Sequence, residues 1–133
     1  MPKQLVRKSI FAAGLIAVLA SCIDKGEEIS LIKNTKFEVG ETYLYDYGDA
    51  RYEVKILTDS TLNWQCVFGE EKGRQETDRF HQKEMEGNNL FVTWAEADGI
   101  GVSQIIDFDK SLVKSYLLID KKIELAEAKI SKK

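Results

Sequence analysis

Apolar residues recur at every second position in short runs between residues 43 and 119, and this alternation constrains the fold more than any other feature. A period of two places successive side chains on opposite faces of an extended strand, whereas a helix has a period of 3.6. The pattern therefore predicts a protein built from β-strands with one apolar face. The clearest core positions are Leu62, Trp64, Cys66, Phe68, Val92 and Trp94, all of which we expect to be buried.

Turn residues such as Gly48-Asp49, Asp59-Ser60 and Asp98-Gly99 separate these runs and divide the chain into strands. Strands are expected at residues 43–47, 52–56, 62–68, 76–82, 90–96, 102–108 and 112–119. Residues 123–130 form either an eighth strand or a short helix. Sequential hairpins favour an all-β, up-and-down antiparallel barrel over a sandwich, because closure removes exposed strand edges.

The N-terminal segment has the three zones of an export signal. A basic stretch precedes an uninterrupted apolar run at residues 10–20, which is too short to span a bilayer as a helix. The sequence Leu19-Ala20-Ser21-Cys22 resembles the lipobox of bacterial lipoproteins. This resemblance implies a signal helix that is cleaved before Cys22, and a mature terminus that carries acyl chains such as palmitate. The alternative is a hydrophobic N-terminal helix with an incidental cysteine.

We therefore divide the chain into a lipoprotein signal peptide at residues 1–21, an acylated tether at residues 22–35 and a β-barrel domain at residues 36–133. The lipid bilayer, reached through acylated Cys22, is the expected partner. The expected location is the bacterial cell envelope, at the outer membrane, on its periplasmic face or at the cell surface.

Charge and the rare residues exclude several function classes. The net charge of -3 includes three basic residues that precede Cys22, so the mature chain is more acidic still and nucleic-acid binding is not expected. His81 is the one histidine, and no histidine-rich metal site, catalytic triad or phosphate-binding loop is present. No metal or cofactor is predicted. Cys66 is interpreted as a small buried residue rather than a reactive thiol, and His81 as a strand-surface or rim residue.

The order of motifs between residues 37 and 119 resembles a known family. The motifs are a tyrosine-rich first strand, Tyr52-Glu53-Val54, Asp59-Ser60-Thr61-Leu62-Asn63-Trp64, Gly73-Arg74, Trp94-Ala95-Glu96 with Gly99, and the strand at residues 102–108. The pattern is similar to the MoaF-like domain, named from molybdenum-cofactor biosynthesis protein F. It is more distantly similar to the bacterial phenolic acid decarboxylases. Both are small calycin-like barrels, of the lipocalin type.

The resemblance to the decarboxylases implies a set of site residues. In those enzymes an arginine after a glycine and a glutamate two residues after a tryptophan lie inside the barrel, and two tyrosines of the first strand bind the substrate carboxylate. Arg74 and Glu96 match the first two. The tyrosine pair is either Tyr45 and Tyr47 or Tyr43 and Tyr45.

The same comparison also shows departures. The decarboxylases have Pro-Thr-Gly-Thr after the glutamate, where this chain has Ala97-Asp98-Gly99-Ile100. They are also longer at the carboxyl end and usually cytosolic. The MoaF-like family matches better in length and in the Glu-x-Asp-Gly turn, and it has no assigned reaction.

The residues themselves support two interpretations. Glu96 alternates in phase with Leu90, Val92 and Trp94, so it belongs to the apolar face, where a carboxyl group that stays protonated can donate a proton. Arg74 could clamp a ligand carboxylate. In the alternative interpretation, Glu96 and Arg74 form an ion pair at the rim, and the aromatic residues Trp64 and Trp94 are simply core.

Three functions follow as hypotheses. The first is a membrane-anchored lipoprotein whose barrel binds a small aromatic or carboxylated molecule with Tyr43, Tyr45, Tyr47, Trp64 and Trp94 as ligand-binding residues. The second is a non-oxidative decarboxylase in which Glu96 is the proton donor and Arg74 assists. The third is a structural or interaction lipoprotein of the envelope that has no ligand.

Overall fold

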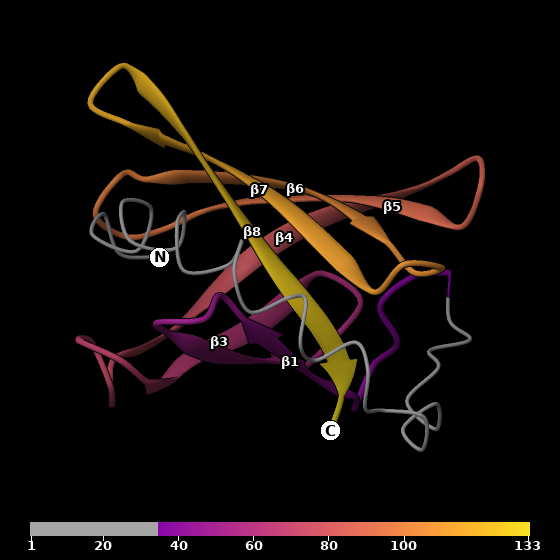
Figure 1. The fold of residues 1–133 in the computed structure, drawn as a ribbon, viewed down its shortest axis with the longest axis horizontal. Coiled ribbons are helices and arrows are strands. Elements are labelled where there is room, and N and C mark those ends of the chain that lie inside the picture. Colours follow the sequence, from indigo (N-terminus) through magenta and orange to yellow (C-terminus); the bar gives the residue numbers. More distant parts are fainter. Residues whose placement is uncertain (1–34) are drawn as a thin grey trace.

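The computed structural model describes residues 35–133, which form a closed antiparallel barrel (Figure 1). Its strands are β1 (Thr42–Asp46), β2 (Arg51–Ile56), β3 (Thr61–Phe68), β4 (Gln75–Met85), β5 (Asn89–Ala95), β6 (Gly101–Asp107), β7 (Leu112–Ile119) and β8 (Lys122–Lys132). Each strand pairs with the next in sequence, and β1 pairs with β8 through the Tyr45–Ile130 register. The prediction of an all-β, up-and-down barrel is confirmed, and the last segment is a strand rather than a helix.

The predictions for the signal peptide, for Cys22 and for the tether up to residue 34 lie outside the described residues. Within residues 35–133, no helix has the length and apolar character needed to cross a membrane.

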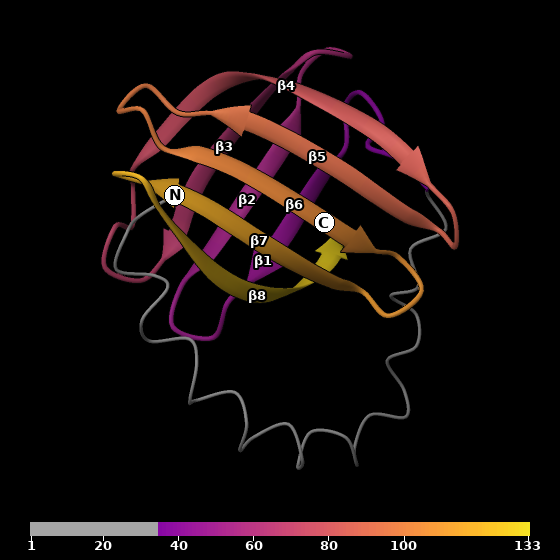
Figure 2. The same cartoon turned by 90° about the horizontal axis from the view of Figure 1, so that it is seen from above.

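Strand β4 is longer than predicted because it belongs to two parts of the wall. Its first five residues, 75–79, pair with β3, and residues 80–85 pair with β5. The strand therefore turns from one side of the barrel to the other. Figure 2 shows the result, with β4 to β8 lying across β1 to β3. In this closed arrangement each described strand pairs with a neighbouring strand on both sides.

The connections between strands alternate between two ends of the barrel. One end is covered by Phe37, which stacks on Tyr43 with 4.8 Å between ring centroids and donates its backbone N–H to the side chain of Gln82 at 3.0 Å. We call this the Phe37 end. The opposite end carries the β1–β2, β3–β4, β5–β6 and β7–β8 turns, and we call it the Arg74 end.

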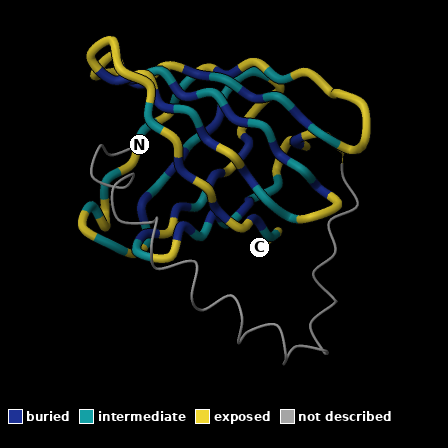
Figure 3. Tube along the Cα trace, turned by 45° about the horizontal axis from the view of Figure 1, so that its top comes forward, coloured by how far each residue is buried: buried dark blue, intermediate teal, exposed yellow. Residues whose placement is uncertain are grey.

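Buried and exposed residues alternate along the strands, as Figure 3 shows and as the period of two predicts. The buried hydrophobic residues of the described chain all lie between Phe37 and Ile130. The described barrel therefore has a hydrophobic core of its own, which makes residues 35–133 the part of the chain to test by itself. This core is rich in aromatic residues. Trp64 is fully buried, and the Tyr52 ring packs against its indole at 6.0 Å.

One core prediction was wrong: Phe68 is 47% exposed, although Leu62, Trp64 and Cys66 in the same run are fully buried. A β-bulge explains the difference. Tyr52 pairs with Cys66, but the preceding Arg51 pairs with Phe68, so Val67 is an extra residue in β3. Paired residues share a face, and Arg51 is on the outside. Phe68 therefore also faces outward, with the Arg51 guanidinium 4.9 Å from its ring centroid.

Candidate functional site

The predicted site residues Arg74 and Glu96 both lie at the Arg74 end, in the β3–β4 and β5–β6 connections. The β3–β4 loop is shaped by glycine. Gly69 has a φ of +115°, and a Cβ on it would lie 2.9 Å from the backbone oxygen of Asp49 in the β1–β2 turn. Only glycine fits this close approach without a shift. Gly73 has a φ of +99° and donates its N–H to the Cys66 carbonyl at 2.8 Å. This turn returns the chain to the barrel wall at Arg74.

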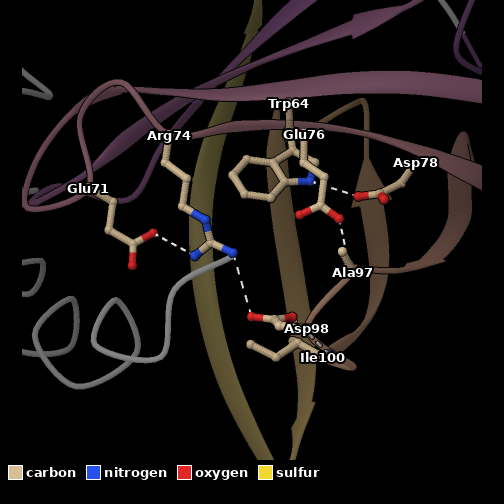
Figure 4. Close-up of polar contacts among 8 residues, drawn as sticks. All are labelled: Trp64, Glu71, Arg74, Glu76, Asp78, Ala97, Asp98 and Ile100. Carbon is tan, nitrogen blue, oxygen red and sulfur yellow. Dashed lines mark hydrogen bonds and ion pairs between the residues drawn. The ribbon is translucent and has the colours of Figure 1, made fainter.

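The Arg74 guanidinium is held by carboxylates of two loops, as Figure 4 shows. It lies 3.1 Å from Glu71 in its own loop and 3.5 Å from Asp98 in the β5–β6 turn. It also lies over the Trp64 ring, 5.3 Å from the centroid, in a cation–π arrangement. Burial by itself would lower the pKa of Arg74, but Glu71 and Asp98 outweigh it and raise that pKa. Arg74 is thus a fixed cation at the rim, and its side chain is 37% exposed.

Two further carboxylates line this end, and neither was among the site residues predicted from the sequence. The Trp64 indole N–H donates to Asp78 at 3.0 Å, and the backbone N–H of Ala97 donates to Glu76 (Figure 4). Burial raises the pKa of Asp78 to about 6; the Trp64 donor opposes the rise, and neighbouring Glu76 adds to it. Asp78 is therefore a carboxyl group that exchanges its proton near neutral pH.

Glu96 lies just beyond β5 and is 4% exposed, so the predicted position on the inward face is confirmed. Its backbone is fixed by the β5–β6 turn, since its N–H donates to the Ile100 carbonyl at 2.8 Å and its carbonyl accepts from Gly99 at 2.9 Å. Asp98, which pairs with Arg74, accepts the N–H of Ile100 in the same turn at 3.2 Å. The Glu-x-Asp-Gly turn thus places buried Glu96 and half-exposed Asp98 two residues apart. Arg74 binds Asp98.

The three predicted tyrosines have different surroundings. Tyr45 donates to Gln104 at 2.8 Å, and Tyr47 shares a hydrogen bond with Ser115 at 2.9 Å. Gln104 also donates to Ser115 at 3.1 Å, so the four residues form a buried network across β1, β6 and β7. Burial raises the pKa of both hydroxyls above their usual range.

Tyr43 lies at the opposite end of the barrel, where its hydroxyl donates to Glu41 at 2.7 Å and its ring stacks on Phe37. Burial, followed by the bond to Glu41, raises its pKa above the usual range. The structure therefore does not bring Tyr43 to Arg74. The prediction that Arg74, Glu96 and one of the other tyrosines bind the same ligand stays a prediction.

Two buried donors near the Arg74 end have no oxygen or nitrogen hydrogen-bond partner among residues 35–133. They are the Trp94 indole N–H and the Tyr52 hydroxyl. Trp94 is 4% exposed and Tyr52 is fully buried. Burial, and then the electrostatic effect of Cys66 and Glu71 together with a weak contact between the hydroxyl and the Cys66 thiol, raises the pKa of Tyr52 above its usual range, so the hydroxyl keeps its proton. An unsatisfied buried donor is costly, and such groups are uncommon in native proteins. Both donors would be satisfied by a bound acceptor.

Cys66 and His81 lie where the sequence analysis placed them, one in the core and one on a strand surface. Cys66 is buried and its thiol donates to the Phe68 carbonyl at 3.3 Å, whereas His81 is exposed on the outer face of β4. No group of three or more potential metal ligands is found within the described chain. The side chains at the Arg74 end can supply hydrogen bonds, aromatic packing and proton exchange by carboxyl groups.

Comparisons with known proteins agree with this fold. A family model described as MoaF-like matches residues 39–130. A crystal structure described as a "putative beta-lactamase" from Burkholderia vietnamiensis is similar, with a TM-score of 0.66 and 14% sequence identity. The match covers 71% of this chain and 94% of that one. At this identity the likeness concerns the fold alone. Among curated proteins, none matches the chain.

Proposed function

Because the chain belongs to the MoaF-like family, whose model spans nearly the whole barrel, we propose that the barrel binds a small aromatic molecule at its Arg74 end. The observation that carries this proposal is the pair of buried donors, Trp94 N–H and Tyr52 O–H, that lack an oxygen or nitrogen acceptor within the described residues. A ligand with a carbonyl or similar acceptor satisfies them. The aromatic rings of Tyr52 and Trp64, packed at 6.0 Å, offer it an apolar surface.

The charges at this end favour a neutral aromatic ligand over a carboxylated one. Arg74 is the cation available to a carboxylate, and Glu71 and Asp98 already bind it. Asp78 and Glu76 add negative charge nearby. A ligand carboxylate would have to displace Asp98 and approach these acids, which costs free energy in a partly desolvated site.

Removal of a single hydroxyl group tests this proposal. The Tyr52→Phe change should weaken binding of 4-hydroxyacetophenone, a neutral phenol with a carbonyl acceptor, by about fivefold, which is the effect of one lost hydrogen bond. It should leave the stability equal or higher, because the hydroxyl has no partner in the unliganded barrel. Tyr116→Phe, on the outer wall, is the control. Calorimetric titration of the barrel, residues 35–133, gives the affinities, and 4-hydroxycinnamate should bind more weakly.

Binding that is equal in the two variants, or absent from wild type for both compounds, would refute the proposed site. In the second case, a structural or interaction role in the envelope would be the remaining function.

A second candidate, a carboxy-lyase, is favoured by the burial of Glu96 and by the protonation of Asp78 near pH 6. Either carboxyl group could donate a proton to a carbanion formed when a substrate loses carbon dioxide. Loss of ultraviolet absorbance from 4-hydroxycinnamate measures this reaction. If Glu96 is the proton donor, the Glu96→Gln variant should show no loss of absorbance. If Asp78 is the donor, the Asp78→Asn variant should show none. No loss with wild-type protein would eliminate the candidate.

We also propose that the barrel is anchored to the cell envelope through acylated Cys22. The support is the order of basic residues, apolar run and Leu19-Ala20-Ser21-Cys22 in the sequence. Cells that express the full chain should incorporate labelled palmitate into it, and Cys22→Ser should abolish this label. Cys66→Ala, which removes the other cysteine, should keep it. A processed, labelled Cys22→Ser protein would contradict the anchor.

A further inference from the structure

A groove with a volume of about 860 Å³ lies on the outer wall of the barrel, across β4 to β8. It is lined by Arg79, His81, Thr93, Trp94, Ala95, Gly101, Ser103, Tyr116, Leu118 and Ile123. The β7–β8 hairpin, which extends beyond the other strands at the upper left of Figure 1, carries one wall of this groove.

The strand register explains the shape of the groove. On the outer face of β5 and β6, the small residues Thr93 and Ser103 are cross-strand partners, and Gly101 pairs with Leu118 of β7. Because Gly101 has no side chain and Thr93 and Ser103 are small, these residues form the floor of the groove, and larger side chains of β7 and β8 form its wall. That wall is apolar, since the cross-strand partners Leu118 and Ile123 are 49% and 65% exposed.

The opposite wall carries one cation, Arg79, and the imidazole of His81. Arg79 and His81 are two residues apart on β4, both exposed and both directed outward. Neither forms an ion pair or a side-chain hydrogen bond with another residue in the described part of the chain. None of the lining residues is acidic, although the chain has 22 Asp and Glu residues and a net charge of -3. The groove is therefore an uncompensated positive site on an acidic protein.

We propose that this groove binds a linear amphiphile, an aliphatic chain that ends in a carboxylate or a similar anionic head group. The head group contacts Arg79 and His81, and the chain lies over the floor against Leu118 and Ile123. Charge complementarity selects the head group, because the groove offers a cation without a carboxylate neighbour. The exposed apolar wall selects the tail, since covering it removes hydrocarbon surface from water. The groove shares Trp94 with the site proposed at the Arg74 end, but its head-group and tail contacts do not depend on the function proposed there.

Calorimetric titration of the barrel with decanoate, below its micelle concentration, tests the head-group contact. Arg79→Gln should weaken decanoate binding by about fivefold and leave the binding of uncharged decanol unchanged. Lys83→Gln is the matched control, because Lys83 is the next outward residue of β4 and lies outside the groove lining. It should change neither affinity by more than about twofold.

The tail contact is tested in the same way. Ile123→Ser should weaken decanoate and decanol alike, by about fivefold, because both lose the same apolar surface. Val39→Ser, which changes an exposed residue at the Phe37 end, is the control and should have no effect. All four positions are exposed in the structure, so folding should be preserved and is checked by circular dichroism.

Three outcomes overturn the proposal. The first is equal loss of decanoate binding in Arg79→Gln and Lys83→Gln, which would indicate general charge attraction. The second is weaker decanoate binding in Tyr52→Phe, which would place the amphiphile inside the barrel. The third is binding to phosphatidylglycerol vesicles without any binding of decanoate, which would make a membrane surface the occupant.

Discussion

The stability of the barrel should decrease as the pH rises through the titration range of Asp78. Its carboxyl group has a pKa of about 6 in the folded chain, against an ordinary value of 3.8, because burial and Glu76 disfavour its ionised form. Between about pH 4 and pH 6 the unfolded chain has therefore lost this proton while the folded chain keeps it. Stability consequently falls with pH in this interval, and above the folded pKa the loss is complete.

The size of the loss follows from the shift. A shift of about two units corresponds to about 3 kcal/mol at most, and partial exposure of the side chain reduces this to about 1–2 kcal/mol. Asp78→Asn removes the titration but keeps an oxygen that accepts the Trp64 indole N–H. The variant should therefore gain about 1–2 kcal/mol on wild type between pH 4.5 and pH 7.5.

Urea unfolding followed by tryptophan fluorescence at several pH values measures this difference. Ionisable groups outside the coupled Asp78–Glu76 pair contribute equally to both proteins and cancel. Asp59→Asn, an exposed acid in the β2–β3 turn, is the control and should run parallel to wild type. If the stability difference between Asp78→Asn and wild type does not change over this pH range, the assignment of a raised pKa to Asp78 is wrong.

Three further changes probe the core and the loops, each measured by urea unfolding at pH 7. Phe68→Ser should cost less than about 0.5 kcal/mol because the ring is exposed, whereas Trp64→Ala should cost about 3–5 kcal/mol; similar costs would contradict the bulge. Tyr45→Phe leaves Gln104 without its donor and should cost about 1–2 kcal/mol, and a neutral result would refute the buried network. Gly69→Ala should cost more than about 1 kcal/mol, because the backbone has a positive φ and the new Cβ meets the β1–β2 turn; an unchanged midpoint would show that the loops do not pack in this way.

The sequence predicted the strands well because the period of two is a local property. The runs around Tyr45, Trp64, Val92 and Ile106 each carry their own alternation, and each lies in a strand. Closure of the barrel was inferred from the number of hairpins. The actual closing contact, Tyr45 with Ile130, depends on the register of strands at opposite ends of the chain.

The failures arise where the answer depends on a partner strand. Phe68 continues the alternation of β3, and only the pairing of Arg51 and Tyr52 with β3 reveals the bulge that turns it outward. Asp78 was missed because the residues on both faces of β4 are mostly polar. The inward face of this strand therefore cannot be recognised by alternating apolar residues. A weak signal existed, since Asp78 is in phase with buried Phe80.

The candidate site was predictable only in part. The Gly73-Arg74 step and the Glu-x-Asp-Gly turn lie at the same end of the barrel, and the predicted burial of Glu96 is confirmed. The contacts of Arg74 were not predictable, because Glu71 and Asp98 come from two loops whose approach is a property of the closed barrel.

The most direct test of the central claim observes the Trp94 indole N–H while ligand is added. Trp94 and Trp64 are the two tryptophans of the chain, so a nitrogen–proton correlation spectrum of the labelled barrel shows two indole signals. Trp64 already donates to Asp78, whereas Trp94 has no acceptor among the described residues. Titration with 4-hydroxyacetophenone should shift the Trp94 signal downfield until it saturates, as the N–H gains an acceptor, and should move the Trp64 signal less. A Trp94 signal that stays in place while the ligand binds, or while outer-wall residues alone respond, would contradict the proposed site.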